Sequence, residues 1–219
     1  MILAIETAAR TMEHVALVWD EQRAAGVAAG ERENVAAELT GEIKALLAEH
    51  GVKGEELEAI AVDCGPGSFT GIRIGIATAR GLSDGWGIQV WGVSQFDAFA
   101  PAAGEGGRLL LIDAGYGRGV YYQIEKGWAI MRGFSPADKL MAVNEIAEGS
   151  GVVLGWREGV ELDEARWRWL GGDVSITAAD VGRAALRLKA AGKELAAEPL
   201  YLHTHAYVKS AAAGLVGMK

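Results

Sequence analysis

The sequence predicts an α/β protein with two lobes, because a similar order of strands and helices occurs twice along its 219 residues. Each half reads as three strands, a helix and a further strand, and in each half another helix follows. The stretch APAAGEGG at 100–107 lies between the halves and has the small, flexible composition of a linker. We therefore expect an N-terminal lobe over residues 1–103 and a C-terminal lobe over residues 104–219.

Three short strands open the first half. The run ILAIET (2–7) is apolar, as in a buried strand. The run EHVALVWD (13–20) alternates apolar residues and suits a half-buried antiparallel strand, and RAAGVAAG (23–30) can supply a third strand. Asn34 is placed to cap a helix over residues 34–50, whose apolar residues follow helical spacing.

A glycine-rich loop, GPGSFTGIR at 65–73, lies between a predicted strand at 57–64 and a predicted helix at 71–85. The loop residues to consider are Gly65, Pro66, Gly67, Ser68, Phe69, Thr70 and Arg73. Backbone N–H groups at such a junction can bind an anion. The loop lacks the Gly-Lys-Ser/Thr of a P-loop, and Thr70 stands where a dinucleotide fingerprint has its third glycine. A tight turn in which Ser68 or Thr70 caps the helix is the simpler interpretation.

A further strand at 87–94 is predicted to end the first half, and the second half repeats the order of elements. A hairpin is predicted around GYGRG (108–125), with a third strand at 127–133. SPADKLMAVNEIAEG (135–149) reads as a helix that its serine caps, with proline at the first helical position. A short strand (151–155) and a helix (177–192) complete the half. Two such halves are typical of the actin-like (ASKHA) architecture, which is built from two ribonuclease H-like units.

The helix after the loop presents Gly71, Gly75 and Ala79 on one face. Small residues four apart allow close approach, and a mid-helix glycine otherwise costs about 1 kcal/mol relative to alanine. The face either packs behind the sheet of its own chain or, with the helix at 34–50, contacts a partner protein. For the second alternative, the candidate interface residues are Val35, Leu39, Ile43, Leu46, Gly71, Ile72, Gly75, Ile76 and Ala79.

Composition limits the functions that the chain can have. Half of the residues are hydrophobic and 23% are charged, as in a globular protein with a core. The net charge of −8 repels nucleic acid, and residues 31–58 hold eight glutamates against three basic residues, a poor surface for RNA. The single cysteine, Cys64, fits a reducing cytosol, and neither a secretory signal nor a membrane-spanning run is predicted. We therefore expect a cytoplasmic protein.

The sequence predicts neither a catalytic residue nor a metal site. The four histidines form no HExxH or HxxxH pair, and the loop serine is not in a G-x-S-x-G elbow. Two carboxylates remain: Glu6, followed by Thr7, ends the first strand of one half, and Asp113 ends the equivalent strand of the other. In actin-like ATPases such strand ends face a nucleotide and its Mg²⁺. The alternative is a pair of capped strand ends with solvent-exposed carboxylates.

Several motifs resemble the TsaB family, formerly YeaZ, over nearly the whole chain. They are MILAIETA at the N-terminus, AIAVDCGPGSFTGIRIGIATARGL (59–82), VWGVSQFDAFA (90–100), LLLIDAGYGRGVYYQ (109–123) and EPLYLH (198–203). The run GPGSFTG-x-R-I-G is the most specific of them. The chain departs from the family pattern at Gly115, Gly119 and His203, where arginine, glutamate and arginine are usual, and at Asn34, where histidine is common.

The resemblance implies an actin-like subunit with no activity and no intrinsic cofactor of its own. Such a subunit binds and supports TsaD, which forms N6-threonylcarbamoyladenosine at position 37 of tRNAs reading ANN codons. The resemblance further implies TsaE as a third component, a homodimer when the chain is alone, and the helices at 34–50 and 71–85 as the interface. Contact with tRNA is implied only through the complex, as is binding of ATP or ADP.

Two other functions remain as alternatives at this point. An independent, actin-like ATP-dependent enzyme would use Glu6 and Asp113 to hold a nucleotide and Mg²⁺. A metallopeptidase is disfavoured because the ligand motifs are missing.

Overall fold

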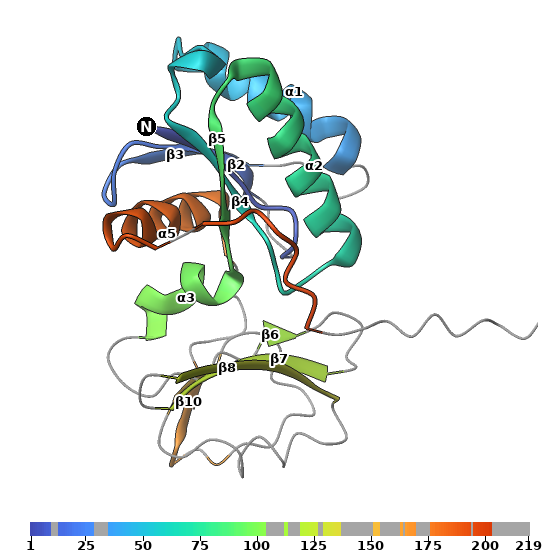
Figure 1. Cartoon of the computed structure of the whole chain (residues 1–219), viewed down its shortest axis with the longest axis vertical. Helices are drawn as coiled ribbons and strands as arrows, with labels where there is room; N and C mark the ends of the chain where they lie inside the picture. The colour runs from blue at the N-terminus through green and yellow to red at the C-terminus, as the bar shows by residue number, and fades with distance from the viewer. Residues whose placement is uncertain are drawn as a thin grey trace, which may run out of the picture.

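The computed structural model describes residues 1–9, 13–28, 35–103, 112–113, 119–126, 129–136, 151–153, 163, 165–169, 176–193 and 195–202 (Figure 1). Several sequence predictions concern residues outside these ranges. They are the cap at Asn34, the linker from residue 104 on, the turn at 114–118 with Gly115, the helix over 137–149 and His203.

A mixed sheet forms the centre of the N-terminal part. Among the described residues it has five strands in the order β3-β2-β1-β4-β5. Their bounds are β1 Ile2–Ile5, β2 Glu13–Val18, β3 Ala24–Ala28, β4 Ala59–Asp63 and β5 Gln89–Val93. β2 is antiparallel to β1 and β3, whereas β4 runs parallel to both β1 and β5. The carboxyl ends of β1, β4 and β5 therefore lie at one edge of the sheet, and all five predicted strands are confirmed.

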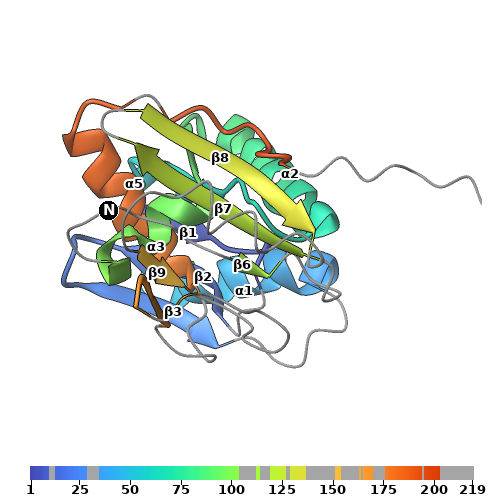
Figure 2. The same cartoon turned by 90° about the horizontal axis from the view of Figure 1, so that it is seen from below.

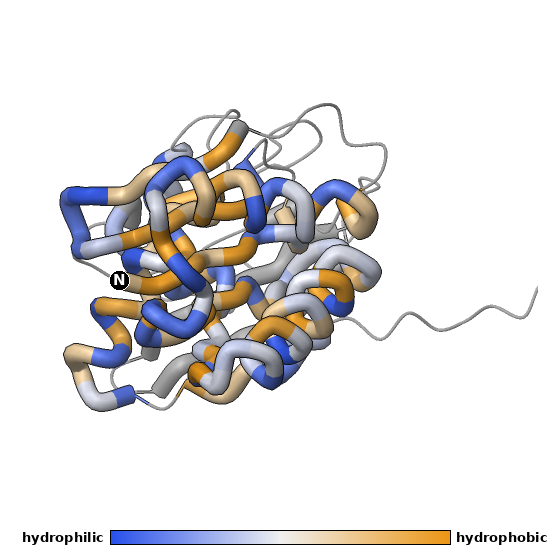
Figure 3. Tube along the Cα trace, turned by 90° about the horizontal axis from the view of Figure 1, so that it is seen from above, coloured by the Kyte–Doolittle hydropathy of each residue, from blue (hydrophilic) through white to orange (hydrophobic). Residues whose placement is uncertain are grey.

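Helices α1 (Val35–Glu49) and α2 (Phe69–Trp86) lie side by side on one face of this sheet (Figure 1). Alternate strand residues, among them Leu3, Ile5 and Ile60, form one apolar cluster with the buried residues of both helices. Figure 3 shows the apolar colour running along the strands between the helices. The two predicted helices are thus confirmed, and α2 begins two residues before the expected Gly71.

Helix α5 (Ala178–Ala190) covers the opposite face of the same sheet (Figure 1). Its alanines pack against Ala4, Ala16 and Val18, so that β2 is buried on both faces. The expectation of a half-buried second strand is therefore wrong. Helix α5, which the sequence places in the C-terminal lobe, thus packs against the sheet of the N-terminal lobe. The lobe boundary at residue 103 stays a prediction.

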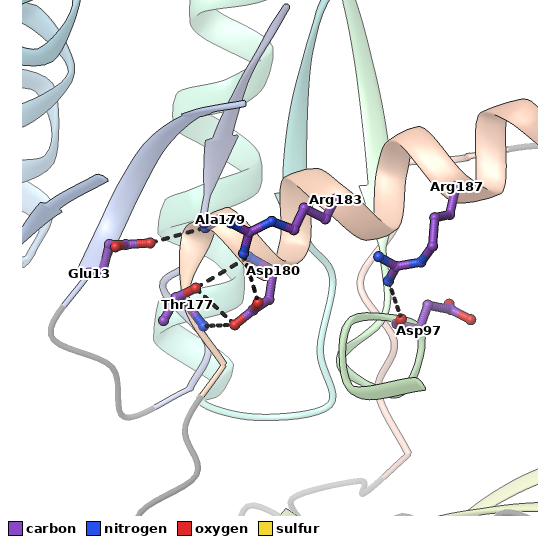
Figure 4. A network of polar contacts seen from close by, with 7 residues as sticks. All are labelled: Glu13, Asp97, Thr177, Ala179, Asp180, Arg183 and Arg187. Atoms are coloured by element: carbon purple, nitrogen blue, oxygen red, sulfur yellow. Dashed lines mark hydrogen bonds and ion pairs between the residues drawn. The ribbon is translucent and has the colours of Figure 1, made fainter. Parts of the chain in front are cut away.

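Polar contacts fix α5 against its neighbours (Figure 4). Thr177 caps its first turn. The side chain of Glu13, in β2, accepts a hydrogen bond from the backbone N–H of Ala179 at 3.0 Å. Further along, Arg187 donates to the carbonyl oxygen of Asp97 at 3.4 Å, in the helix that follows β5. These contacts anchor α5 at both the strand and the helix beside it.

That neighbouring helix, α3 (Gln95–Ala103), is not predicted from the sequence. Residues 100–103 continue the helix instead of starting a linker, although Pro101 lies inside it. Phe96 and Phe99 are buried in the apolar cluster on the α5 side of the sheet. This burial holds the segment in a helix even though proline removes a backbone hydrogen bond.

The second half contributes two small sheets to the described structure. β6 (Ile112–Asp113), β7 (Gly119–Lys126) and β8 (Ala129–Pro136) are antiparallel neighbours, and β9 (Gly151–Val153) pairs in parallel with β10 (Trp167–Trp169). In Figure 2, β7 and β8 lie in front of α3 and the N-terminal sheet. The predicted hairpin, third strand and strand at 151 are confirmed, whereas β10 is not predicted.

One predicted helix start is wrong. Ser135 and Pro136 belong to β8, where they pair with Val120 and Gly119 of β7, so they do not begin a helix. In the described ranges, no helix is both long enough and apolar enough to cross a membrane.

Candidate functional site

Two carboxylates meet at the edge where the parallel strands β1 and β4 end. Glu6 follows β1, Asp63 ends β4, and the relative exposures of the two residues are 0% and 1%. Glu6 Oε1 accepts hydrogen bonds from the backbone N–H groups of Ala8 and Ala9, each at 2.6 Å. Asp63 Oδ2 accepts one from the amide nitrogen of Gln95, the first residue of α3, at 2.9 Å. The acid pair therefore joins β1, β4 and α3 below the protein surface.

Burial raises the pKa of both carboxyl groups. For Glu6 the loss of hydration is the largest cause and the charge of Asp63 the second, and together they hold its pKa well above the ordinary 4.5. The pKa of Asp63 is also raised by burial, against hydrogen bonds from Glu6, Gly65 and Gln95 that favour its ionised form. Among the described residues, Glu6 Oε2 is buried and has no hydrogen-bond partner. Protonation of Glu6 removes the repulsion between the two buried charges, so its neutral form is more favoured than that of an ordinary surface carboxyl group.

Backbone contacts join the glycine loop to this pair. The N–H of Gly65 donates to Asp63 Oδ1 at 2.7 Å, and the Gly65–Pro66 peptide bond is cis. The N–H of Ser68 donates to the carbonyl oxygen of Ala8 at 2.9 Å. Ser68 also caps α2, because its Oγ accepts a hydrogen bond from the N–H of Gly71 at 3.1 Å. The capping interpretation of the loop is confirmed for Ser68, and anion binding there stays a prediction.

The acid pair links β1, β4 and α3 through buried hydrogen bonds, and it does not form an open catalytic centre. Glu6 is fully buried, so the expectation of a solvent-exposed strand end is wrong for it. Thr7 is also engaged inside the protein, because its Oγ1 donates to the carbonyl oxygen of Gly71 at 2.7 Å. Asp113 lies in β6 but its side chain is outside the described residues. The nucleotide cleft between Glu6 and Asp113 therefore stays a prediction, and in this conformation a nucleotide has no access to Glu6.

The small-residue face of α2 packs against its own sheet. A Cβ atom at Gly71 would overlap the carbonyl oxygen of Thr7, and one at Gly75 would lie 2.5 Å from Thr7 Oγ1 and 3.3 Å from Val62 Cγ2. Ala79, on the same face, is fully buried. The interface expectation is corrected for these three residues, because the helix approaches the end of β1 and not a partner.

The same correction applies to most of the remaining predicted interface residues. Those buried in the apolar cluster between the helices and the sheet are Leu39, Ile43, Leu46, Ile72 and Ile76. Val35, at the start of α1, is partly exposed, and its contact with a partner stays a prediction.

The outward faces of the two helices carry small residues that the chain itself does not use. We call this surface the outer helix face: Ala37, Gly41, Ala45 and Ala48 of α1 with Ala77, Gly81 and Gly85 of α2, all exposed. A Cβ atom at Gly41, Gly81 or Gly85 would meet no atom within 4 Å. Each mid-helix glycine costs roughly 0.5–1 kcal/mol relative to alanine. Packing within the chain does not account for this cost.

Two further reactive side chains, those of His14 and Cys64, are buried. His14 lies under α1 with Nδ1 at 3.6 Å from Glu42 Oε2. Burial and the neighbouring Asp63 raise the pKa of the Cys64 thiol to about 12, so this cysteine stays a thiol near neutral pH. Over the residues that the structure describes, no group of three or more His, Cys, Asp or Glu side chains is placed to hold a metal ion.

Sequence reasoning missed Asp63, Gln95 and the exposed glycines. Asp63 carries a signal, because it ends a buried strand as Glu6 does. Only the parallel pairing of β1 and β4 brings the two together, and this pairing depends on the topology. The exposed glycines carry a signal too, since Gly41 and Gly81 fall opposite the apolar positions of their helices.

Comparisons with known proteins extend over most of the chain. The family model "TsaD: tRNA N6-adenosine threonylcarbamoyltransferase" matches residues 31–144. The tRNA threonylcarbamoyladenosine biosynthesis protein TsaB of Escherichia coli is 31% identical over 182 residues, which are 74% of this chain and 78% of that protein. An uncharacterized protein of Mycobacterium tuberculosis is 42% identical over 77 residues, and this match spans only 36% of its length and 33% of this chain.

A comparison with solved structures covers more of the chain than the sequence comparisons do. The solved structure of YeaZ from Pseudomonas aeruginosa has a TM-score of 0.68 at 25% identity, and the match covers 92% of this chain and 99% of that chain. The α/β, actin-like fold class predicted from the sequence is thereby confirmed.

Proposed function

Because the chain belongs to the TsaB/YeaZ family of tRNA threonylcarbamoyladenosine biosynthesis proteins, we propose that it is a non-catalytic subunit that binds and supports TsaD. In this proposal TsaD forms N6-threonylcarbamoyladenosine at position 37 of tRNAs reading ANN codons. The chain described here supplies a binding surface and no reacting group.

The observation that carries the proposal is the outer helix face. Gly41 and Gly81 lie inside α1 and α2 on their exposed faces, and a Cβ atom at either would meet no atom of another described segment within 4 Å. Small residues at a helix surface let the backbone of a second helix approach closely. The favourable packing with a bound partner then offsets the cost of glycine in helix stability. A helical interface explains both glycines, which the packing of the isolated chain does not.

The acid pair supports a non-catalytic role. Glu6 and Asp63 lie at the edge of the sheet where α/β proteins commonly bind ligands, yet both are buried. Glu6 accepts backbone hydrogen bonds, and Asp63 accepts one from the side chain of Gln95. An ATP-dependent enzyme of the actin-like class needs carboxylates that reach Mg²⁺ or its water ligands. The buried pair therefore disfavours that alternative.

The remaining parts of the proposal concern assembly. TsaE joins the complex, tRNA is bound only by the assembled complex, and ATP or ADP is bound there and not by this chain alone. Without TsaD, the outer helix face pairs two copies of the chain as a homodimer. The protein acts in the cytoplasm with its tRNA substrates.

The test replaces Gly81 on the outer helix face by leucine. The Gly81→Leu variant should fold, because the added side chain meets no atom of the chain, but it should lose the TsaD heterodimer, because the leucine separates the two helix backbones. Ala190→Leu is the matched control, since Ala190 is an exposed residue of α5 on the opposite face of the sheet. Light scattering on a sizing column would measure the mass of each variant alone and with TsaD of the same organism.

The outcomes separate the interface from the partner role. Wild type and Ala190→Leu should both form a species of heterodimer mass, while Gly81→Leu should elute separately from TsaD. Heterodimer formation by Gly81→Leu would exclude the outer helix face as the interface. A wild-type chain that does not associate with TsaD, with or without ATP, would contradict the partner role itself.

A further inference from the structure

Two exposed aromatic rings lie together beside the glycine loop. Phe69, the first residue of α2, has a relative exposure of 39%, and Tyr201 has 43%. They are far apart in the sequence, yet their ring centroids are 5.1 Å apart with an interplanar angle of 35°. Large aromatic residues that stay exposed and clustered mark binding surfaces more often than scattered apolar residues do.

The two rings hold the guanidinium of Arg73 in one orientation. Its Cζ atom lies 3.8 Å from the centroid of the Phe69 ring, and its Nε donates a hydrogen bond to the hydroxyl of Tyr201 at 3.2 Å. One of the five N–H donors of the guanidinium is thereby used. In the part of the chain that the structure describes, no carboxylate pairs with Arg73, and its two terminal nitrogens have no hydrogen-bond partner. The side chain is thus oriented and exposed, with a free pair of donors.

We propose that Phe69, Arg73 and Tyr201 form an anchor that binds a carboxylate side chain of the protein partner. The proposal rests on the proposed function, because the partner is TsaD, and it adds a polar contact beside the outer helix face on the same helix. The two terminal nitrogens of Arg73 form a fork that matches the two oxygens of a carboxylate. The rings keep the fork oriented before binding, so that less rotamer freedom is lost when the pair forms.

The charge of the surroundings favours an acidic protein group over RNA. An RNA backbone requires several cationic side chains along its path. The other arginine of α2, Arg80, uses a terminal nitrogen to donate to the carbonyl oxygen of Ala197 at 2.8 Å. The chain as a whole carries a net charge of −8. Among the described residues of this cluster, one free guanidinium over the Phe69 ring and bonded to the Tyr201 hydroxyl therefore fits one carboxylate better than a polyanion.

The experiment compares two arginines of one helix by calorimetric titration with TsaD. Arg73→Gln and Arg80→Gln remove the same charge, but Arg73 contacts the two aromatic residues, whereas Arg80 donates to the carbonyl oxygen of Ala197. Arg73→Gln should weaken TsaD binding by at least about 30-fold, the range for losing one side of a buried charge pair, and Arg80→Gln should change it by less than about threefold. Phe69→Leu keeps the charge and removes the ring, and it should give an intermediate loss. Raising the NaCl concentration should weaken wild-type binding more than binding by Arg73→Gln.

The possible outcomes distinguish the anchor from a folding defect, from an RNA-binding site and from the proposed subunit role. Thermal unfolding of Arg73→Gln should match the wild type, since the side chain is exposed, so that weaker binding is not a folding defect. Equal affinities for Arg73→Gln and Arg80→Gln would overturn the anchor while leaving the subunit role in place. Unchanged TsaD binding with weaker tRNA binding by the complex would assign the cluster to RNA and overturn it as well. A wild-type chain that does not bind TsaD would overturn the proposed function and, with it, the anchor.

Discussion

The two faces of α2 use the same residue type for opposite purposes. On the inner face, Gly71 and Gly75 leave room for Thr7, whose carbonyl oxygen and hydroxyl lie where their Cβ atoms would be. On the outer face, Gly81 and Gly85 have no atom within 4 Å of the same position. The inner glycines are therefore explained by the fold of the chain alone, and the outer glycines are not.

The difference shows what helical spacing can and cannot tell. Glycines four residues apart indicate that something approaches the helix closely, but the spacing does not say whether it is a strand of the same chain or a partner. The sequence leaves a partner helix as one candidate for the close approach, and the structure assigns it to the end of β1. Residues that face away from the core, such as Gly81, are the better candidates for an interface.

Gly75→Leu on the inner face should have the largest effect. The leucine would collide with Thr7 Oγ1 and Val62, in a part of the core that has no space for it. We expect a loss of at least about 3 kcal/mol in the free energy of unfolding, as for severe overpacking. Urea denaturation followed by tryptophan fluorescence would measure it, with Gly85→Leu on the outer face as the control. Equal midpoints for the two variants would contradict the assignment of Gly75 to the core.

Glu6→Gln should change how stability depends on pH. Because the pKa of Glu6 is raised, the folded state binds more protons than the unfolded state above pH 4.5, so its contribution to stability falls as the pH rises toward the folded pKa. The loss is about 1.4 kcal/mol for each unit by which the pKa is raised. Glutamine keeps an N–H donor for Asp63 but does not ionise, so the variant should lack this loss.

Urea denaturation at a series of pH values would test the prediction for Glu6. The difference in the free energy of unfolding between wild type and Glu6→Gln should shift in favour of the variant as the pH rises above 4.5. Parallel curves for the two proteins would show that the pKa of Glu6 is not raised in the folded protein. Asp63 remains in both proteins, so its own titration contributes to both curves.

The parts of the fold that the sequence predicts are those with local signals. The five strands of the N-terminal sheet and helices α1, α2 and α5 follow from apolar periodicity, glycines and capping residues over short stretches. The second face of β2 is buried by α5 from the far end of the chain, which no local pattern of β2 reveals. Helix α3 is missed because Pro101 and the alanines around it resemble a linker, whereas burial of Phe96 and Phe99 decides the conformation.

The candidate site divides in the same way. The cap at Ser68 follows from residue type and position, and the structure confirms it. The pairing of Glu6 with Asp63 depends on the order of the strands, which sequence periodicity does not contain. The cluster of Phe69, Arg73 and Tyr201 brings together residues from distant parts of the chain, so its members are seen as a unit only in the folded protein.

Gly81→Ala should have the smallest effect and the opposite sign. Because the new methyl group meets no atom of the chain, the substitution should raise the free energy of unfolding by roughly 0.5–1 kcal/mol, the difference in helix propensity between alanine and glycine. Gly71→Ala is the inner-face counterpart and should lower it, since its methyl group would overlap the carbonyl oxygen of Thr7. Urea denaturation of both variants gives the two signs directly. A loss of stability at Gly81 would mean that folding itself requires this glycine, and the argument that a partner uses the outer helix face would lose its basis.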